Sequence, residues 1–204
     1  NPKPPFTTST LQQEAARKLR FSARRTMNNA QNLYRSGFIT YMRTDSTNLS
    51  AEGVNGAKAE IISSFGKEYL PEKPKVYTSK VVNAQEAHEA IRPAGLKFAS
   101  ITDVKSELDD DAAKLYDLIK KRTLASQMKS AKIKQVSVII KNQNLDFRAS
   151  GKIILFPGFM AAYVESNDEH NDSGDMKETV LPHLEKSQSL DCKDLRPEEH
   201  NTKP

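Results

Sequence analysis

A tyrosine and an arginine, separated by one residue, are the side chains of this sequence best suited to chemistry on a phosphate. Tyr41 and Arg43 lie between Gly37 and a polar turn that runs from Thr44 to Ser50. A phenol can act as a nucleophile, and a guanidinium can hold a phosphate through two parallel hydrogen bonds. Residues 38–41 favour β structure, and alternate side chains of a strand share a face, so both are expected to project together.

Each member of this pair also has an ordinary structural interpretation. A tyrosine at a strand end is commonly a half-buried packing residue whose hydroxyl bonds to the backbone. Arg43 can form a surface ion pair with Asp45. A phenol is protonated at neutral pH, so Tyr41 needs a base or positive surroundings in order to attack. Arg43 supplies one positive neighbour and can offset charge that develops on a phosphodiester.

His88 is the third candidate. It lies among Glu86, Glu89 and Arg92 in a polar stretch that Pro93 must end. A histidine there can donate a hydrogen bond to a phosphate or relay a proton, although a lone histidine is more commonly structural. Its spacing from Glu89 and Arg92 matches no zinc motif, and the other histidines are scattered, so no histidine metal site is expected.

Other cofactor signals are weak. The three aspartates at 109–111 could suggest magnesium, but at the start of a helix they are better explained as capping residues. No Walker-type glycine loop is present, so ATP use is not predicted. Cys192 is the only cysteine, which excludes an internal disulfide and favours a reducing compartment.

Composition and charge favour a polar protein with an anionic partner. Hydrophobic residues make up 37% and charged residues 28% of the 204. No apolar run approaches the ~20 residues of a membrane helix, and the N-terminus has no secretory h-region. The formal net charge is +5, but residues 1–48 carry eight bases against Glu14 and Asp45, whereas residues 165–178 are acidic. DNA or RNA is the leading candidate partner; a solvated charged surface is the alternative.

Helices are expected to position these side chains. Ser9 or Thr10 can cap a helix that runs to about Leu19, and Ser22 can cap a second one that Gly37 ends. This pair, with the strand that follows, has the pattern of a winged helix-turn-helix, which is a weak signal because short helix pairs are common. Three more helices are expected, with these bounds: Ser50 to about Ser64, Ser100 to about Glu107, and Asp109 to about Met128.

A small β region is expected after residue 128, where we place a domain boundary. From Lys132 the apolar residues alternate, which predicts a strand, a turn at Asn142-Gln143-Asn144 and a returning strand. The acidic stretch at 167–175 is expected to be a loop, and residues 180–181 and 189–195 are expected to add further strands.

Three ordered segments carry a resemblance to a known family. Residues 37–50 (GFITYMRTDSTNLS) resemble the active-site segment of the type IA DNA topoisomerases. Residues 5–13 (PFTTSTLQQ) are similar to the helical entry of the same domain, and residues 85–93 (QEAHEAIRP) to a second block. Met42 favours the bacterial topoisomerase I branch, because topoisomerase III and reverse gyrase relatives usually carry proline there. The resemblance extends more weakly over the β tail.

The resemblance implies a reaction and roles for these residues. Tyr41 would attack one DNA strand and keep its 5′-phosphate as a phosphotyrosine ester. The other strand would pass through the gap, and religation would relax negative supercoils without ATP. Arg43 would position the scissile phosphate and His88 would assist by hydrogen bonding, while Thr40, Asp45 and Ser46 would also contact DNA. Magnesium would be held by the acidic residues of a TOPRIM domain elsewhere in the parent chain, with no metal site in this piece.

The fold expected on these grounds is α+β. Residues 1–128 would form a winged-helix-like tyrosine domain, and residues 129–204 part of the β-rich arch of the topoisomerase toroid. The chain, which begins at Asn1 without an initiator methionine, is expected to be a central piece of a longer monomeric protein of the bacterial cytoplasm and nucleoid. Its expected partners are single-stranded and negatively supercoiled DNA and the TOPRIM and gate domains. Alone it should not relax DNA. The alternatives are a non-enzymatic winged-helix DNA-binding module and an interaction scaffold.

Overall fold

The structure, a computed structural model, describes residues 1–77, 88–164, 184–194 and 196. It combines helices with a two-stranded sheet, and it divides into two compact units. Among the described residues, the helical unit comprises 1–134 and 154–164, and the second unit comprises 135–153 and the described residues from 184 onward. No helix in these ranges is both long and apolar enough to cross a membrane.

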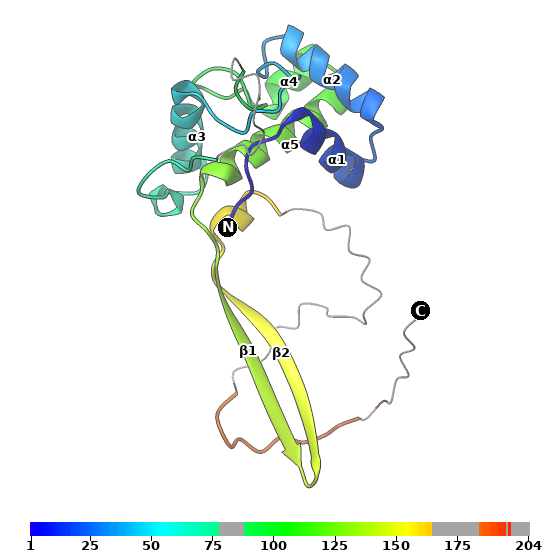
Figure 1. Ribbon diagram of the computed structural model, residues 1–204, viewed down its shortest axis with the longest axis vertical. Helices are drawn as coiled ribbons and strands as arrows, with labels where there is room; N and C mark the ends of the chain where they lie inside the picture. Colours follow the sequence, from blue (N-terminus) through cyan, green and yellow to red (C-terminus); the bar gives the residue numbers. More distant parts are fainter. Residues whose placement is uncertain (78–87, 165–183, 195, 197–204) are drawn as a thin grey trace. The chain divides into compact units, whose positions relative to one another are not determined.

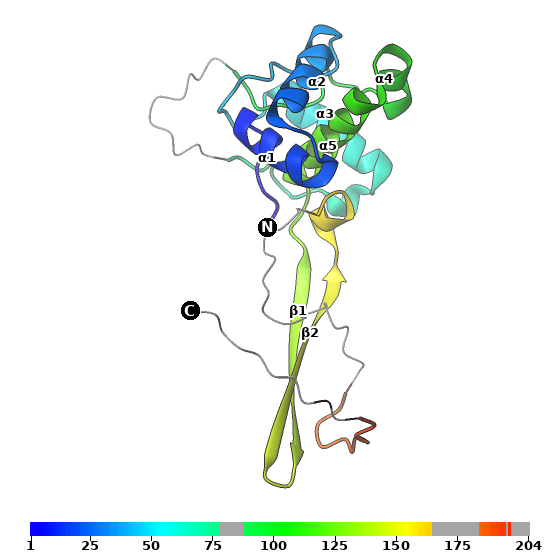
Figure 2. The same ribbon diagram turned by 90° about the vertical axis from the view of Figure 1, so that its right-hand side faces the viewer.

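The helical unit is built around its longest helix, α5. The five α-helices are α1 (Thr8–Leu19), α2 (Ala23–Arg35), α3 (Ala51–Ser64), α4 (Ile101–Glu107) and α5 (Asp110–Gln127), with short 3-10 turns at Lys67–Tyr69 (η1) and Gly158–Ala161 (η2). Figures 1 and 2 show α5 among the other helices, and it contacts α1, α2, α3, α4 and η2. Leu115, Tyr116 and Ile119 on α5 are fully buried in the main core. Burial of these side chains is the main source of stability for the unit.

Side-chain caps fix where the helices begin, and the sequence predicts the starts of four of them. Ser22, Ser50, Ser100 and Asp109 each accept a hydrogen bond from a backbone amide of the first turn of their helix. The expected cap of the first helix is wrong by two residues or more. Thr7 caps α1, and Thr10 is the reciprocal partner in its capping box.

The segment that carries Tyr41 is not a strand, contrary to expectation. Ile39 forms an isolated antiparallel bridge with Pro93, and Phe6 forms another with Ile91. After Ile39 the backbone bends at Met42 and Arg43 and stays irregular to Ser50. The segment instead takes its hydrogen bonds from the N-terminal end of α1 and from residues 90–94. Strand alternation therefore does not place Tyr41 and Arg43, and tertiary hydrogen bonds hold their segment instead.

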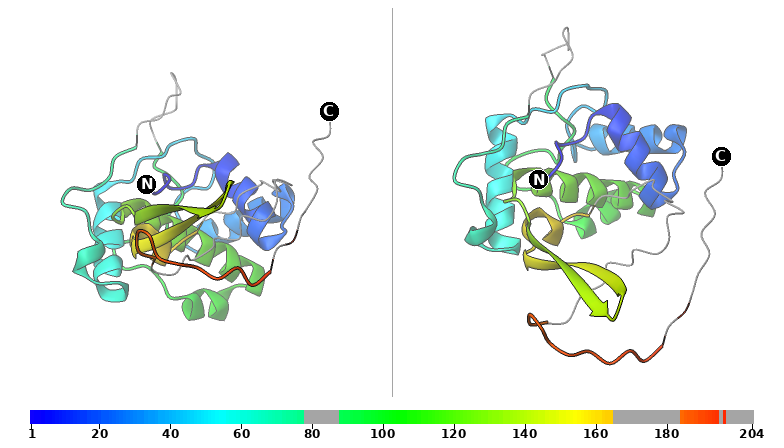
Figure 3. Two further views of the ribbon diagram at one scale, coloured as in Figure 1. Left: turned by 90° about the horizontal axis from the view of Figure 1, so that it is seen from below. Right: turned by 60° about the horizontal axis from the view of Figure 1, so that its bottom comes forward.

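The expected hairpin is present. Strand β1 (Lys132–Asn142) and strand β2 (Leu145–Phe156) form a two-stranded sheet. Gln143 in the turn has a φ of 51°, the left-handed conformation that tight hairpin turns require. Figures 2 and 3 show that the two strands twist about each other, as two-stranded ribbons do. Residues 189–194 form no strand, contrary to expectation, and residues 165–183 and 195 lie outside the described part.

The compact units differ from the expected division at residue 128. Residues 154–164 belong with the helical unit. Phe159 donates its backbone amide to the Lys129 carbonyl (2.9 Å), and the Tyr163 hydroxyl donates to Oε1 of the buried Glu14 on α1 (2.7 Å). Gly158 has a φ of +51°, and a Cβ there would lie 2.5 Å from the Lys129 carbonyl oxygen, so only glycine permits this approach. The chain thus returns to the helices after β2.

Candidate active site

Tyr41 is half-buried and held by its ring. The ring packs against the main core, and Ile39 and Met42 on either side of it are buried. Its centroid lies 5.3 Å from that of Tyr34 at an interplanar angle of 69°, and 5.1 Å from that of His88 at 44°. Within the described residues the Tyr41 hydroxyl has no hydrogen bond. The ring is thereby positioned while the oxygen stays available to a substrate.

The N-terminal end of α1 holds the backbone directly after Tyr41. The Thr8 hydroxyl donates to the Met42 carbonyl (2.8 Å) and accepts from the Thr44 amide (2.9 Å), and the Thr8 amide donates to the Thr44 carbonyl (2.9 Å). Met42 and Thr44 are buried, whereas Arg43 between them is exposed. Arg43 forms no ion pair with Asp45 or with any other described residue. The hydrogen bonds from Thr8 thus fix the backbone on both sides of Arg43 and leave its guanidinium exposed, two residues from Tyr41.

Thr40 joins the tyrosine segment to the histidine segment. Its hydroxyl donates to the Ala90 carbonyl (2.8 Å) and accepts from the Arg92 amide (3.0 Å), and its own amide donates to the Arg92 carbonyl (2.9 Å). These bonds span about fifty residues of chain and bring His88 next to Tyr41. Residues 85–87, the first three of the segment 85–93 that resembles the second family block, lie outside the described residues. His88 itself is exposed.

Asp45 and Ser46 lie in the irregular turn after Arg43. Asp45 is exposed, and the Ser46 amide donates to the Thr44 hydroxyl (3.0 Å). The Ser46 hydroxyl accepts from the Asn48 amide (3.2 Å). Both residues therefore lie within a few positions of Arg43, and Ser46 also stabilises the turn itself.

A buried arginine, Arg92, fixes the histidine segment to the start of α3. Its side chain is 3% exposed and makes a two-point contact with Glu89, with both nitrogen–oxygen distances 2.8 Å. It also donates to Glu52 Oε1 (3.1 Å), the Ser50 hydroxyl (3.2 Å) and the Pro93 carbonyl (2.7 Å). Glu89 in turn accepts from the Ser50 amide (2.9 Å). A bidentate pair of this kind is geometrically demanding, so it orients the segment that carries His88.

The electrostatics of this cluster favour the charged forms. Burial alone would raise the pKa of Glu89, but hydrogen bonds from Arg92 and Ser50 outweigh it, and the pKa is lowered. For Arg92, burial acts to lower the pKa, and the two glutamates reverse the effect and raise it. Both groups are therefore ionised at neutral pH and neutralise each other inside the protein.

Several of these residues could not be chosen from the sequence. Thr8 contacts Met42, Glu89 contacts Ser50 and Arg92 contacts Glu52, and the members of each pair lie more than thirty positions apart in the sequence. Tyr34, in the last turn of α2, is 43% exposed and touches Tyr41. In the sequence, the contact between the two tyrosines is indicated only by their spacing of seven residues across a glycine turn. Such a spacing is too common to be informative.

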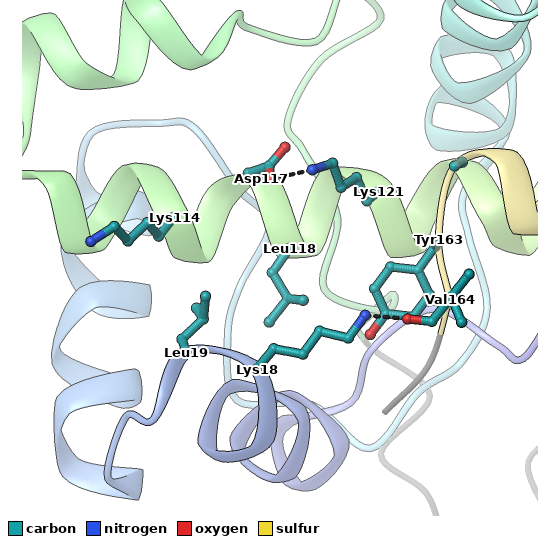
Figure 4. Close-up of a pocket in the computed structure, with 9 residues that line it drawn as sticks. Lys18, Leu19, Lys114, Asp117, Leu118, Lys121, Tyr163 and Val164 are labelled. Atoms are coloured by element: carbon teal, nitrogen blue, oxygen red, sulfur yellow. Dashed lines mark hydrogen bonds and ion pairs between the residues drawn. The ribbon is translucent and has the colours of Figure 1, made fainter. Parts of the chain in front are cut away.

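A separate basic hollow lies elsewhere on the helical unit. It has a volume of about 320 Å³ and lies between α1, α5 and residues 162–164 (Figure 4). Its charges are largely paired: Lys121 binds Asp117 at 2.6 Å, and Lys18 binds the Val164 carbonyl and lies 3.9 Å from the centre of the Tyr163 ring. None of its lining residues is a candidate site residue.

The described residues offer no metal site of their own. No group of three histidine, cysteine, aspartate or glutamate side chains in the described ranges is placed to hold an ion. Asp109 caps α5, as the sequence predicts, and Asp111 pairs with Arg25 at 2.5 Å. Asp109 and Asp111 are therefore already engaged, one in a helix cap and the other in an ion pair.

Comparison with known proteins identifies the family. A family model described as DNA topoisomerase matches residues 1–204. DNA topoisomerase 1 of Mycobacterium leprae is 52% identical over 208 residues, and that of Synechocystis sp. is 50% identical over 203. Each match covers 100% of this chain and 22% of the relative, so the chain spans about a fifth of the length of these relatives.

A solved structure supports the same family assignment. Full-length topoisomerase I from Thermotoga maritima matches 81% of this chain and 28% of its own, with a TM-score of 0.67 and 37% identity. The matches to these two curated relatives thus extend over the whole of this chain, at 52% and 50% identity. The chain belongs to the DNA topoisomerase family, within its bacterial topoisomerase I members.

Proposed function

We propose that this chain carries the nucleophile of a type IA DNA topoisomerase. The Tyr41 oxygen attacks a backbone phosphorus of one DNA strand, and the bond from phosphorus to the 3′ oxygen breaks. The strand keeps a 5′-phosphotyrosine link on one side, and the 3′ oxygen takes up a proton on the other. Because one phosphodiester replaces another, the reverse attack reseals the strand without ATP. Strand passage between the two steps relaxes negative supercoils.

One observation carries this proposal: Tyr41 lies in ring contact with His88, with the exposed Arg43 two residues away, in a chain that matches the family over its whole length. Arg43 would hold the non-bridging oxygens through its fork of donors. His88 would donate a hydrogen bond to the same phosphate. Asp45 and Ser46 would contact the flanking strand, and Thr40 would contribute by holding the two segments together.

The second half of the site would come from the parent protein. As the family resemblance implies, we place Mg²⁺ on the acidic residues of a TOPRIM domain of the same parent chain. When bound there, the ion would neutralise charge on the phosphate. Nothing in the roles given to Tyr41, Arg43 and His88 depends on this chain binding it.

The finer domain assignment is also proposed. Helices α1 and α2 with the bridged segment after them would act as a winged-helix-like unit, and the hairpin would be part of the β arch. The tyrosine domain would then extend over residues 1–128 and be completed by the return of residues 154–164. The parent would be monomeric, act in the bacterial cytoplasm at the nucleoid, and bind single-stranded and negatively supercoiled DNA. Match over the whole chain supports this function over a non-enzymatic DNA-binding module.

The test is an assay for a covalent adduct that survives denaturing detergent. The parent protein, magnesium and an end-labelled single-stranded oligonucleotide are mixed, and the wild type is compared with Tyr41→Phe. The wild type should form an adduct that maps to Tyr41, and the variant should form none, because phenylalanine keeps the ring but lacks the oxygen.

Tyr34→Phe is the matched control, since it removes the neighbouring phenol oxygen and leaves Tyr41 in place. An adduct that persists in Tyr41→Phe would sink the assignment of the nucleophile. Sequence-dependent duplex binding in the wild type, without any adduct, would instead support the DNA-binding module.

A further inference from the structure

Tyr34 is a large aromatic side chain left exposed directly beside the proposed nucleophile. It lies in the last turn of α2, whose other face is buried through Thr26, Ala30 and Leu33. The residue is 43% exposed, and its ring makes an edge-to-face contact with Tyr41 at 5.3 Å between centroids. Within the described residues its hydroxyl has no hydrogen bond. Beyond its contact with Tyr41, the Tyr34 side chain therefore contributes little to the packing of the fold.

The mounting of Tyr34 is rigid. Its carbonyl accepts the amide of Gly37 (3.0 Å), and Gly37 has a φ of +74°, so the chain turns sharply at the end of α2. The Leu33 carbonyl accepts the amide of Phe38 (2.9 Å) in the same turn. The helix end and the tyrosine segment are thus joined by two backbone hydrogen bonds. Tyr34 cannot move far from Tyr41 without breaking this turn.

We infer that Tyr34 is a platform on which a base of the cleaved strand stacks, next to the scissile phosphate. The inference rests on the proposed function, because it needs a strand whose phosphate lies at the Tyr41 oxygen. A base that reaches a ring in contact with Tyr41 belongs to a nucleotide that flanks this phosphate. Every base has a flat π face, so stacking on tyrosine works for any sequence. The exposed Arg35, which follows in the chain, adds a positive charge for the backbone of the same nucleotide.

Stacking at this point would serve the reaction in a specific way. Unpaired bases can be splayed and bound by aromatic rings, whereas paired bases in a duplex cannot. A flanking base held on Tyr34 would fix the register of the strand, so that one phosphate faces Tyr41 and Arg43. Tyr34 would then be a positioning residue for single-stranded substrate, and it would make no contact with the reacting atoms.

The test uses the parent protein in a Tyr41→Phe background, so that DNA binds without being cut. Single-stranded oligonucleotides carry 2-aminopurine, whose fluorescence is quenched by stacking, at one position at a time around a mapped cleavage site. We expect quenching at a position that flanks the scissile phosphate. Tyr34→Leu should abolish that quenching, and Tyr34→Phe should restore it, because the ring alone is needed. Ile62→Ala, which truncates another side chain exposed by 43%, should leave the quenching intact.

A second measurement separates stacking from a purely structural effect on Tyr41. In proteins with Tyr41 intact, an abasic substitution at the quenched position should weaken oligonucleotide binding about 10-fold or more in the wild type. In Tyr34→Leu the same abasic substitution should cost less than 3-fold, because the stacking is already lost. Equal losses in both proteins, or no quenching at any flanking position, would overturn the inference. Failure of the wild type to form any Tyr41 adduct would instead overturn the proposed function.

Discussion

At the scale of single residues, the site combines a fixed ring with free polar groups. Tyr41 is positioned by ring contacts with Tyr34 and His88 and by the core beneath it. Arg43 is exposed because its two neighbours, Met42 and Thr44, are the anchored ones. Groups that are held in place before the substrate arrives need less reorganisation during the reaction, which is the arrangement that electrostatic catalysis requires.

The role of Arg43 can be tested against that of a simple positive charge. Arg43→Lys keeps the charge but loses the two-point fork, and Arg43→Ala loses both. We expect the rate of adduct formation to fall about 10²-fold or more in Arg43→Ala, with Arg43→Lys between it and the wild type.

Arg43 is exposed and has no described ion-pair partner. The free energy of unfolding of the Arg43→Ala protein should therefore differ from that of the wild type by less than about 0.5 kcal/mol. Rapid-quench adduct formation and urea unfolding measure the two quantities. A full rate in Arg43→Ala would exclude Arg43 from phosphate binding, and a large loss of stability would mean that the rate effect is structural. Arg24→Ala, which removes an exposed arginine in the first turn of α2, is the matched control for loss of surface charge.

At the scale of elements, the positions of most helices could be predicted and the contacts between them could not. Caps at Ser22, Ser50, Ser100 and Asp109 are local signals, and local hydrogen bonds decide where helices begin. The hairpin likewise follows from alternation and a short turn. The residues of the tyrosine segment favour β structure, but the segment has a bridge at Ile39 alone and then bends. Tertiary hydrogen bonds from Thr8 and Arg92 outweigh that preference.

The same limit applies to the candidate site. Tyr41, Arg43 and His88 were identified from residue type, neighbours and family resemblance, and the structure brings the two rings together. Nothing local in the sequence indicates that Thr40 joins Ala90 and Arg92, since this pairing closes a loop of about fifty residues. Long-range pairing of this kind depends on the whole core, so only the structure reveals it.

The Glu89–Arg92 pair makes a prediction about pH. The folded state lowers the pKa of Glu89 and so favours its ionised form. Glu89 therefore contributes stability above its ordinary pKa of 4.5, and that contribution is lost as the pH falls through the lower value of the folded state. Glu89→Gln should cost about 1–3 kcal/mol of unfolding free energy at pH 7, because it leaves buried Arg92 with a weakened partner.

Urea unfolding of both proteins across the acid range measures this difference. The difference in unfolding free energy between the wild type and Glu89→Gln should be largest near neutral pH and should decrease steadily below pH 4.5. A gap that stays constant down to the lowest pH at which the proteins fold would contradict a stabilising charge on Glu89. Glu107→Gln, at the end of α4 and exposed, is the matched control.

Gly53 on α3 gives a second test of the same contact. A Cβ at this position would lie 2.5 Å from Arg92 Nε and 2.6 Å from Arg92 Cδ, which is too close for real atoms. Gly53→Ala should lower the unfolding free energy by about 1–3 kcal/mol, although alanine is the better helix former. In an Arg92→Ala background the clash is gone, and the same substitution should be neutral or stabilising by up to about 1 kcal/mol. Equal destabilisation in both backgrounds would place the strain elsewhere.

At the scale of the whole molecule, the hairpin is the part of the chain that makes too few contacts within itself to be stable alone. Within the described residues its sheet has two strands, and Ile139, Leu145 and Leu155 are 63%, 62% and 64% exposed. A two-stranded hairpin is marginally stable in water, and unpaired edges with apolar side chains favour association with further strands. The proposed arch, with strands from elsewhere in the parent, would supply that cover.

Hydrogen exchange can distinguish a hairpin that stands alone from one that belongs to a larger sheet. In the isolated 204-residue chain, the amides of residues 132–156 should exchange much faster than those of α5, because few buried contacts oppose local opening. In the parent protein the same hairpin amides should become protected, since both edges would then be paired. The amides of α5, which is buried by its own unit, serve as the internal control and should be protected in both proteins. Fast exchange of the hairpin in the parent as well would mean that the β strands do not enter an arch, whereas slow exchange in the isolated chain would mean that the two strands are stable without one.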